Sequence, residues 1–543
     1  MNEIKPLSVI DYSFQYQIRE TLALKKLNFE IEKGEILLIA GSSGCGKTTL
    51  MRSINGLIPY SYRGNAQGDI QLFGKSVFDM KMVEISQIVG TVLQDPERQI
   101  VASFVFNEIA FGLENLGLPK EEILDRIDSI MRYLKISHLK DRETFQLSGG
   151  EKQKVVLAGV LAMNPKILLL DEPLASLDPA SAVESLQVIR KLAEDGISVI
   201  IVEHRVEDVL QIKPEKVMYL DEGEITYLGA AKGLLNVVDY SKIKLPAEVI
   251  IERSKESKKA FTFPALMSEK NDDKPVIRFE DVSFRYKNDL PDVLKGINFT
   301  INQNDIIAIL GHNGAGKTTL VKHALGLLKP TEGTVYMDDV STKQLSVAKS
   351  AHTIGYVFQS PSQMLFAPTV EEELSFGPKN IGQPKEEIKE NVNWAIRTVN
   401  LETELKTPPL ALSFGQQKRV SIASILAMKS RVLMMDEPTA GQDYWNYQSF
   451  MDSIMEMKAF DAMLFITHDV DLAVIYANRV LLIYDGRIIA DGSPYEVLKD
   501  EDRLRQCRIV PTSLLRLNLE HHPHTKQFMR AEALASVLNQ DVQ

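Results

Sequence analysis

Two stretches decide the fold of this chain: Gly41-Ser42-Ser43-Gly44-Cys45-Gly46-Lys47-Thr48-Thr49 and Gly311-His312-Asn313-Gly314-Ala315-Gly316-Lys317-Thr318-Thr319. Both have the pattern GxxxxGK[ST], in which glycines let successive backbone N–H groups turn inward around phosphates. Each follows a short apolar run, at Ile36–Ala40 or Ile306–Leu310, and such runs are typical of buried parallel strands. The sequence therefore predicts two phosphate-binding loops between a strand and a helix.

A second repeated motif lies downstream of each loop. Leu168-Leu169-Leu170-Asp171-Glu172-Pro173 corresponds to Leu433-Met434-Met435-Asp436-Glu437-Pro438. The same motif order at a nearly constant offset indicates two copies of one domain. Short apolar runs alternate with helical patterns in both copies. The predicted fold class is therefore α/β, with two tandem P-loop NTPase domains around mostly parallel central sheets.

The repeat also predicts where the domains begin and end. We expect a first domain at 1–243, a linker at 244–274, a second domain at 275–505 and a partly helical C-terminal tail at 506–543. The segment between the two copies is rich in charged residues, which favours an exposed linker.

Composition excludes several classes of protein. The 543 residues carry a net charge of −11 and only two cysteines. The acidic total argues against a nucleic-acid partner, and two isolated cysteines argue against zinc, an iron–sulfur cluster or a disulfide framework. No apolar stretch approaches the ~18–20 residues that span a bilayer, and the N-terminus does not resemble a signal peptide. We expect a cytoplasmic protein with no membrane anchor of its own.

The two glycine-rich loops predict nucleotide binding with ATP and Mg²⁺ as the cofactors. Lys47 and Lys317 should reach the β- and γ-phosphates, while Thr48 and Thr318 should place a hydroxyl on Mg²⁺. The predicted nucleotide-binding residues of these loops are Gly41, Ser42, Ser43, Gly44, Cys45, Gly46, Lys47, Thr48 and Thr49, and Gly311, His312, Asn313, Gly314, Ala315, Gly316, Lys317, Thr318 and Thr319.

Two acidic residues end each of the downstream apolar runs. Asp171 and Asp436 lie at a strand tip near the loop, where a carboxylate suits Mg²⁺ or its surroundings. Glu172 and Glu437 follow immediately, and because the chain turns at the strand end they can face an attacking water. They are the candidate general bases.

A third motif narrows the family. Leu147-Ser148-Gly149-Gly150-Glu151 and Leu412-Ser413-Phe414-Gly415-Gln416 resemble the LSGGQ signature of ATP-binding-cassette (ABC) ATPases. The resemblance extends over most of the chain. It implies helical subdomains that carry the signatures, and it assigns roles by position. These are Gln94 and Gln359 as Q-loop glutamines that sense Mg²⁺, His204 and His468 as switch histidines, Asp178 and Asp443 in the D-loops, Tyr16 and Tyr286 stacking on adenine, and Ser148, Gly150, Ser413 and Gly415 contacting the γ-phosphate.

The same resemblance implies an intramolecular dimer of the two cassettes. In this family two cassettes pack head to tail, so that the signature of one covers the P-loop of the other. Fusion in one chain favours that pairing through effective concentration. The departures from the family pattern are Phe414, Glu151 and Gly441-Gln442. They leave open whether the two sites are equally active.

The regions after the two Q-loop glutamines, 94–115 and 359–380, resemble the ATPases of energy-coupling-factor (ECF) vitamin and metal-ion importers. This implies a transmembrane coupling subunit and a substrate-binding membrane subunit on separate chains, and a peripheral position on the cytoplasmic face of the cell membrane. Glu371, Glu372 and Glu373 would suit a basic helix of such a partner. The alternative for these acidic residues is a solvated helix face.

Two other functions stay open. One is a soluble tandem cassette without a transport role, although neither a long basic arm nor iron–sulfur cysteines are present. The other is the ATPase of a sugar or peptide importer. The transported substrate is selected by another subunit, so this sequence does not identify it. His521-His522-Pro523-His524 lacks partners at ligand spacing, and we expect a solvated loop there rather than a metal site.

Overall fold

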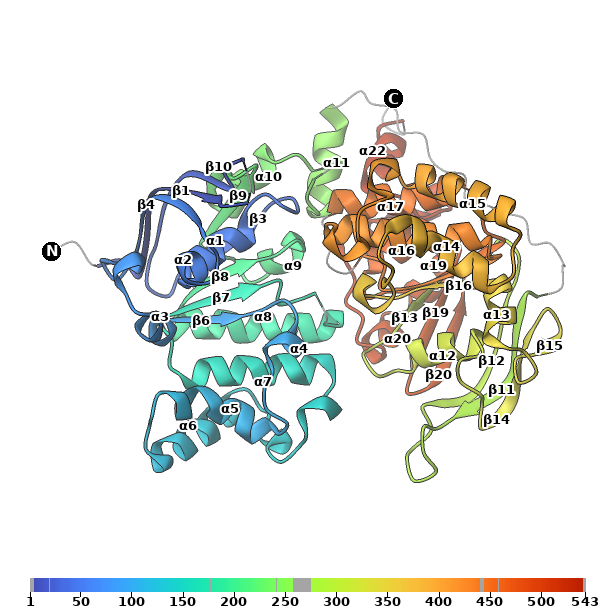
Figure 1. Ribbon diagram of the computed structural model, residues 1–543, viewed down its shortest axis with the longest axis horizontal. Coiled ribbons are helices and arrows are strands. Elements are labelled where there is room, and N and C mark those ends of the chain that lie inside the picture. The colour runs from blue at the N-terminus through green and yellow to red at the C-terminus, as the bar shows by residue number, and fades with distance from the viewer. Residues whose placement is uncertain are drawn as a thin grey trace. The chain divides into compact units, whose positions relative to one another are not determined.

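The computed structural model divides the chain into two compact units (Figure 1). The first comprises residues 1–245 with 443–445, and the second comprises 246–442 and 446–543. In Figure 1 the first unit runs from blue to green and the second from green to red. The residues described are 4–18, 20–175, 177–240, 242–256, 275–439, 444–457 and 459–540.

The first unit contains two sheets. Its antiparallel sheet has the order β2-β1-β4-β5, and its central sheet has the order β10-β9-β3-β8-β7-β6. All pairs of the central sheet are parallel except β9 with β10. The strands are β1 (Leu7–Tyr16), β2 (Leu24–Ile31), β3 (Ile36–Ala40), β4 (Gly64–Leu72), β5 (Lys75–Ser76), β6 (Val89–Val92), β7 (Ile167–Asp171), β8 (Ser198–Val202), β9 (Lys216–Asp221) and β10 (Glu224–Gly229).

The helices of the first unit cover both faces of its central sheet. Figure 1 shows α5, α6 and α7 together at the end of the unit away from β1 and β4. The helices are α1 (Lys47–Ile54), α2 (Leu57–Tyr60), α3 (Met82–Ile88), α4 (Pro96–Gln99), α5 (Val105–Asn115), α6 (Lys120–Tyr133), α7 (Gly149–Ala162), α8 (Pro179–Glu194), α9 (Val206–Leu210) and α10 (Ala231–Val237).

The second unit repeats this plan. Its sheets have the orders β12-β11-β14-β15 and β16-β17-β18-β13-β19-β20, which match the first unit strand for strand. The strands are β11 (Ile277–Phe284), β12 (Leu294–Ile301), β13 (Ile306–Leu310), β14 (Glu332–Met337), β15 (Val340–Ser341), β16 (Ile354–Val357), β17 (Val432–Asp436), β18 (Ala462–Ile466), β19 (Arg479–Tyr484) and β20 (Arg487–Gly492).

The second unit has more helices at its C-terminal end than the first. The helices are α11 (Ala247–Glu256), α12 (Lys317–Ala324), α13 (Val347–Thr353), α14 (Val370–Asn380), α15 (Lys385–Thr398), α16 (Phe414–Met428), α17 (Tyr444–Met457), α18 (Val470–Tyr476), α19 (Pro494–Leu498), α20 (Glu501–Gln506), α21 (Ser513–Thr525) and α22 (Ala531–Gln540).

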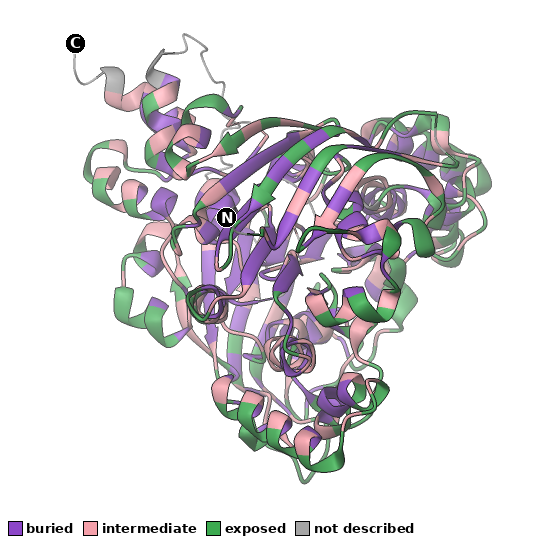
Figure 2. Cartoon of the chain, turned by 90° about the vertical axis from the view of Figure 1, so that its left-hand side faces the viewer, coloured by how far each residue is buried: buried purple, intermediate pink, exposed green. Residues whose placement is uncertain are grey.

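Strands in the middle of the two central sheets are buried along their whole length. Every residue of β3, β8 and β13 is buried, because helices cover a parallel sheet on both faces. Figure 2 shows purple along the strands inside the unit, while green lies on the outer helices and on parts of the antiparallel sheet. The prediction of two α/β domains with mostly parallel central sheets is confirmed.

Part of the predicted linker is a folded element instead of an exposed segment. The residues of α11 form a helix in which Ala247, Ile250 and Ile251 are buried. This helix packs against α21 and α22 of the C-terminal tail, and the Ala247 N–H donates to Ser513 Oγ at 2.8 Å. Its apolar side chains were too few in a charged segment to reveal this packing.

The predicted solvated loop at residues 521–524 is wrong, because these residues lie in α21. His522 stacks on Tyr495 with ring centroids 3.6 Å apart, and Phe528 meets both rings edge-on. In the described part of the chain there is no group of three or more His, Cys, Asp or Glu residues that could hold a metal ion. His522 therefore packs against Tyr495 and Phe528 within the second unit.

Candidate nucleotide-binding sites

The glycine-rich loops have the same shape in both units. Gly46 and Gly316 cap the following helices with φ of 112° and 104°, a left-handed conformation that glycine adopts at no steric cost. A Cβ atom on Gly46 would lie 2.7 Å from the Ala23 carbonyl oxygen. Glycine at this position is therefore required both by backbone conformation and by space.

The two loop lysines are buried and lie against the loop carbonyls. Lys47 Nζ donates to the carbonyl oxygens of Gly41 and Ser42, both at 2.8 Å. Lys317 Nζ donates to the corresponding carbonyl oxygens of Gly311 and His312 at 2.7 and 2.9 Å. Each ammonium group thus lies inside the curve of its loop, the place where phosphates bind in P-loops.

The aspartates at the strand tips have different surroundings in the two units. Asp436 Oδ2 accepts hydrogen bonds from Thr318 Oγ1 at 3.1 Å and from Tyr356 Oη at 3.0 Å. A hydroxyl and a carboxylate oxygen this close are the oxygen donors that Mg²⁺ prefers. In the first unit Thr48 is exposed, and burial, with the neighbouring Glu172, raises the pKa of Asp171 to about 6.

The glutamates after these aspartates turn toward the predicted switch histidines. Glu172 and Glu437 have φ of 46° and 45°, so the chain leaves the strand direction at this residue. Glu172 Oε1 lies 3.1 Å from His204 Nε2. Glu437 Oε1 lies 3.3 Å from His468 Nε2. The structure therefore brings each predicted base together with its predicted histidine.

The two predicted Q-loop glutamines differ from each other in their contacts. Gln94 Nε2 donates to Glu172 Oε2 at 2.6 Å. Gln359 is exposed, and its side chain makes no hydrogen bond to the residues that the structure describes. Burial raises the pKa of Glu437 above its usual range, and its Oε2 instead accepts the His468 backbone N–H at 3.2 Å.

Each predicted adenine-stacking tyrosine is linked to its own loop. Tyr16 Oη lies 3.1 Å from Thr49 Oγ1, and Tyr286 Oη lies 3.2 Å from Thr319 Oγ1. Each ring also meets a phenylalanine two residues earlier edge-on, with centroids 4.9 Å apart. A tyrosine ring is thus positioned beside each P-loop.

The signature serines cap the long helices α7 and α16. Ser148 and Glu151 form a reciprocal capping box, in which Glu151 Oε2 accepts both the Ser148 N–H and its hydroxyl at 2.8 Å. Ser413 forms the same box with Gln416, whose Oε1 accepts the Ser413 N–H at 3.0 Å. Within the described residues, neither serine is hydrogen-bonded to the P-loop of its own unit.

The D-loop predictions are described only in part. Asp178 caps α8 by accepting the Ser181 N–H at 2.9 Å. Asp443 and its neighbours Gly441 and Gln442 lie outside the described residues, as does Ser176.

Sequence reasoning missed three polar residues at these sites. Tyr356 contacts Asp436, as given above. Glu203 accepts the N–H groups of Leu174 and His204 at 3.0 and 2.9 Å. Lys418 Nζ donates to the Glu437 carbonyl oxygen at 3.0 Å, and burial lowers the pKa of this lysine to about 7. Glu203 directly precedes the switch histidine, which is the only sequence signal that could have identified it.

Two P-loop domains, each with a buried lysine, an Asp-Glu strand tip, a facing histidine and a capped signature helix, define a tandem P-loop ATPase. The family description "ABC transporter" matches residues 24–175 and 294–440. The chain belongs to the ABC transporter family, as an ATP-binding protein that hydrolyses ATP. Members bind ATP, usually with Mg²⁺.

Similar proteins span nearly the whole chain. A putative ABC transporter ATP-binding protein of Methanosarcina mazei is 35% identical over 94% of this chain and 92% of its own length. One from Bacillus cereus is 35% identical over 94% of this chain and 95% of its own. A solved structure of CbiO1 from Clostridium perfringens, part of the ABC transporter complex CbiONQ, covers 49% of this chain and 100% of its own length at 31% identity. Its TM-score against this chain is 0.40.

Among the residues that the structure describes, no helix is both long and apolar enough to cross a membrane.

Proposed function

We propose that this chain is the ATP-hydrolysing subunit of a multi-subunit importer of the ECF type, for a vitamin or a metal ion. The proposal that it hydrolyses ATP is supported by the Glu–His pair at each strand tip. The histidine Nε2 lies 3.1 Å from the glutamate Oε1 in the first unit and 3.3 Å in the second. Because the pairs are present twice, both units have the groups that hydrolysis needs.

The roles follow from these contacts. Glu172 and Glu437 accept a proton from the attacking water, and His204 and His468 orient the glutamate while facing the γ-phosphate. Both oxygens of each carboxylate are engaged, because His204 and Gln94 contact Glu172, while the imidazole and the backbone N–H of His468 contact Glu437. The left-handed backbone of Glu172 and Glu437 at the strand end directs each carboxylate toward its histidine.

The oxygen donors at the strand tips fit Mg²⁺, because threonine hydroxyl, carboxylate and glutamine carbonyl oxygens are hard ligands. The residues that would hold the ion are Thr48, Gln94 and Asp171 in one unit and Thr318, Gln359 and Asp436 in the other. When bound, Mg²⁺ neutralises the charge of the phosphates.

We further propose that the two cassettes form a head-to-tail intramolecular dimer. Ser413 and Gly415 would then complete the site of Lys47, while Ser148 and Gly150 would complete the site of Lys317. The capping boxes support this role, since they fix the first turns of α7 and α16 with their N–H groups available to an anion.

A membrane partner is supported by exposed aromatic side chains after each Q-loop. Phe366 and Phe376 meet edge-on with centroids 4.7 Å apart, although 61% and 49% of their surfaces are exposed. Phe104 and Phe111 in the first unit are also about half exposed. Large exposed aromatics are typical of interaction surfaces. We assign these to transmembrane subunits on separate chains, which would place this protein at the cytoplasmic face of the cell membrane.

The acidic residues near these aromatics have two roles. Glu373 is buried, and its carboxylate accepts the N–H groups of Phe366 and Ala367 at 2.9 and 2.8 Å. Glu108 does the same for Val101 and Ala102 in the first unit. Glu373 therefore shapes the loop rather than facing a partner. Glu371 and Glu372 are exposed and remain the candidates for contact with a basic helix.

The catalytic assignment is tested by Glu172→Gln combined with Glu437→Gln. The amide cannot accept a proton from water, so turnover should fall at least ~100-fold while ATP binding persists. ATPase rate and nucleotide affinity are measured on the full chain.

The matched control is Glu121→Gln with Glu386→Gln, which changes exposed glutamates at corresponding positions of α6 and α15. This control should retain the wild-type rate. Turnover near the wild-type rate in the Glu172/Glu437 variant would remove both residues from the role of base.

The membrane assignment is tested separately by Glu371→Lys with Glu372→Lys. Co-purification of membrane subunits should decrease, while the ATPase rate of the isolated chain stays unchanged. Normal assembly of this variant would favour the solvated helix face, and a failure of assembly would leave the catalytic assignment untouched.

A further inference from the structure

The first unit contains a cavity of about 520 Å³ that its nucleotide site does not use. The cavity lies at the ends of β7 and β8 where these strands begin, since Lys166 and Ile197 directly precede them. Asp171 is at the other end of β7, so the cavity and the nucleotide site occupy opposite edges of the sheet. From this cavity we infer a binding site for a small organic anion with an apolar body.

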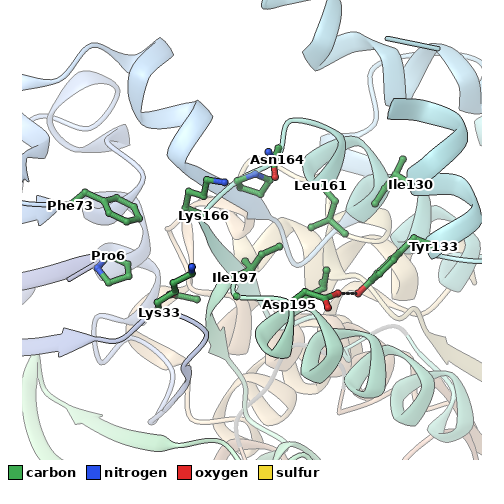
Figure 3. Close-up of a pocket in the computed structure, with 14 residues that line it drawn as sticks. Pro6, Lys33, Phe73, Ile130, Tyr133, Leu161, Asn164, Lys166, Asp195 and Ile197 are labelled. Atoms are coloured by element: carbon green, nitrogen blue, oxygen red, sulfur yellow. Dashed lines mark hydrogen bonds between the residues drawn. The ribbon is translucent and has the colours of Figure 1, made fainter. Parts of the chain in front are cut away.

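Three parts of the first unit meet at this cavity. Figure 3 shows Pro6, Phe73 and Lys33, from the antiparallel sheet and its connections, facing Ile130 and Tyr133 of α6. The end of α7 and the turn after α8 close it from the remaining sides. An occupant would therefore touch the antiparallel sheet, the central sheet and the helices that carry the signature.

The second unit has an ion-pair bridge at the corresponding place. Arg431 directly precedes β17, and its guanidinium donates to Asp461 at 2.7 Å and to Asp338 at 2.9 Å. Asp461 directly precedes β18, and Asp338 directly follows β14. These three side chains join the same three strand ends that surround the cavity in the first unit.

The first unit lacks both carboxylates of this bridge. Ile197 stands before β8 and Phe73 stands after β4, at the positions of the two aspartates, while Lys166 replaces the arginine. The backbone is equivalent at Phe73 and Asp338, because the Phe73 N–H donates to the Pro6 carbonyl at 3.1 Å as the Asp338 N–H donates to the Val276 carbonyl at 3.0 Å. The side chains at these strand ends differ, with a salt bridge in the second unit and a lysine beside apolar side chains in the first.

The charges of the cavity favour an anion. Lys33 lies over Gly196, where a Cβ atom would be 3.2 Å from Lys33 Cε. Across the residues that the structure describes, neither Lys33 nor Lys166 forms an ion pair. The one lining carboxylate, Asp195, accepts a hydrogen bond from Tyr133 Oη at 2.9 Å (Figure 3). Two ammonium groups thus face a cavity with one engaged carboxylate.

Size and lining define the chemical class of the ligand. A volume of about 520 Å³ falls in the range of ~300–1,000 Å³ that small-molecule sites show, and such sites combine apolar walls with a few polar groups. Phe73, Ile130 and Leu161 supply apolar wall, and the lysines supply the charge that a carboxylate or phosphate requires. The ligand is an organic monoanion whose apolar part is an aromatic or branched group.

The test uses 4-phenylbutyrate as the probe and its uncharged amide as the matched compound. Binding to the full chain is measured by saturation-transfer NMR, with saturating ADP present to occupy the nucleotide sites. The acid should bind at least tenfold more tightly than the amide. Lys33→Gln with Lys166→Gln should weaken binding of the acid at least tenfold and leave the amide unchanged.

A second variant rebuilds the bridge of the other unit. Phe73→Asp, Lys166→Arg and Ile197→Asp together should abolish binding of the acid, and ADP binding confirms that the variant is folded. The control is Lys26→Gln with Lys232→Gln, which removes two exposed lysines elsewhere in the unit and should bind the acid normally. Equal affinity for acid and amide, no binding of the acid to the wild-type chain, or unchanged binding in the Lys33/Lys166 variant would each overturn the proposal.

Discussion

The two cassettes share a backbone but differ in the polar groups around it. Both have the buried P-loop lysine, the left-handed glutamate after the strand and the histidine that faces it. Around this shared set, the first unit places Glu203 before the histidine and Gln153 in the signature helix. The second unit has Thr467 and Lys418 at these positions. The chemistry of the site has thus been kept while its electrostatic surroundings have changed.

The residues that differ between the two units surround the Asp-Glu motif and the histidine but do not belong to them. Lys418 places a buried amine against the Glu437 carbonyl in the second unit, whereas Gln153 donates to the Pro173 carbonyl in the first. The first unit instead buries an extra carboxylate, Glu203, and burial raises its pKa. The two sites therefore differ in the ionisable groups buried around them, and their rates of hydrolysis should differ as well.

The largest effect should come from Lys418→Met, compared with Gln153→Met. The lysine variant leaves the carbonyls of Glu437 and Pro438 without their donor, which should cost about 3 kcal/mol of local stability. Gln153→Met removes one such bond and should cost about 1 kcal/mol. Hydrogen exchange of the peptides around each Asp-Glu motif measures both. An equal loss of protection in the two variants would show that Lys418 contributes no more local stability than Gln153.

Glu203→Thr should have the next largest effect, because it gives the first unit the residue of the second. The shorter side chain cannot hold the backbone N–H groups of Leu174 and His204 together, so the turn that carries His204 loosens. Measured with Glu437→Gln present, so that only the first site turns over, the ATPase rate should fall about tenfold. Thr467→Ser with Glu172→Gln is the matched control and should change the second site little. An unchanged rate after Glu203→Thr would make this carboxylate dispensable.

Tyr356→Phe tests a smaller difference between the sites. Tyr356 donates to Asp436 from β16, whereas the corresponding residue of β6 is Thr91. Loss of one hydrogen bond to the aspartate should raise the Mg²⁺ concentration for half-maximal ATPase about threefold, measured with Glu172→Gln present. Thr91→Val, with Glu437→Gln present, should leave the Mg²⁺ requirement of the first site unchanged. The same shift in both variants would mean that Asp436 is not specifically oriented by Tyr356.

Glu151→Gln should have the smallest effect. It restores the family signature, keeps the capping box and removes one negative charge from the start of α7. If the cassettes pair head to tail, the second site should turn over up to about twofold faster, because a phosphate at this helix end would no longer meet that carboxylate. Gln416→Glu is the reciprocal variant and should slow the first site. A change confined to the cassette that carries the substitution would contradict the shared-site arrangement.

Much of the fold and of the two candidate sites could be predicted from local sequence. The glycine pattern, the apolar strands and the Asp-Glu strand tips predict the loops and the sheets, because each depends on residues that are adjacent along the chain. The pairing of Glu172 with His204 also follows once the family motif is recognised, since both residues end neighbouring parallel strands.

Other features depend on contacts between distant residues and could not be predicted in this way. Lys418 and Arg419 are adjacent basic residues in α16, and only the packed structure shows that the Lys418 side chain is the buried one. The cavity in the first unit depends on Phe73, Lys166 and Ile197, which are far apart in the sequence and come together only in the folded unit. The buried role of Glu373 likewise depends on a loop that folds back onto its helix.

The docking of α11 has a consequence for how the chain can be divided. This helix precedes the second cassette in sequence, yet its apolar face is covered by α21 and α22 from the last forty residues. If the polypeptide were cleaved between residues 257 and 274, the N-terminal fragment would keep α11 and the C-terminal fragment would keep its binding surface. The two fragments would then be a ligand and its receptor, and co-expressed halves should reassemble through this helix without a peptide bond between them.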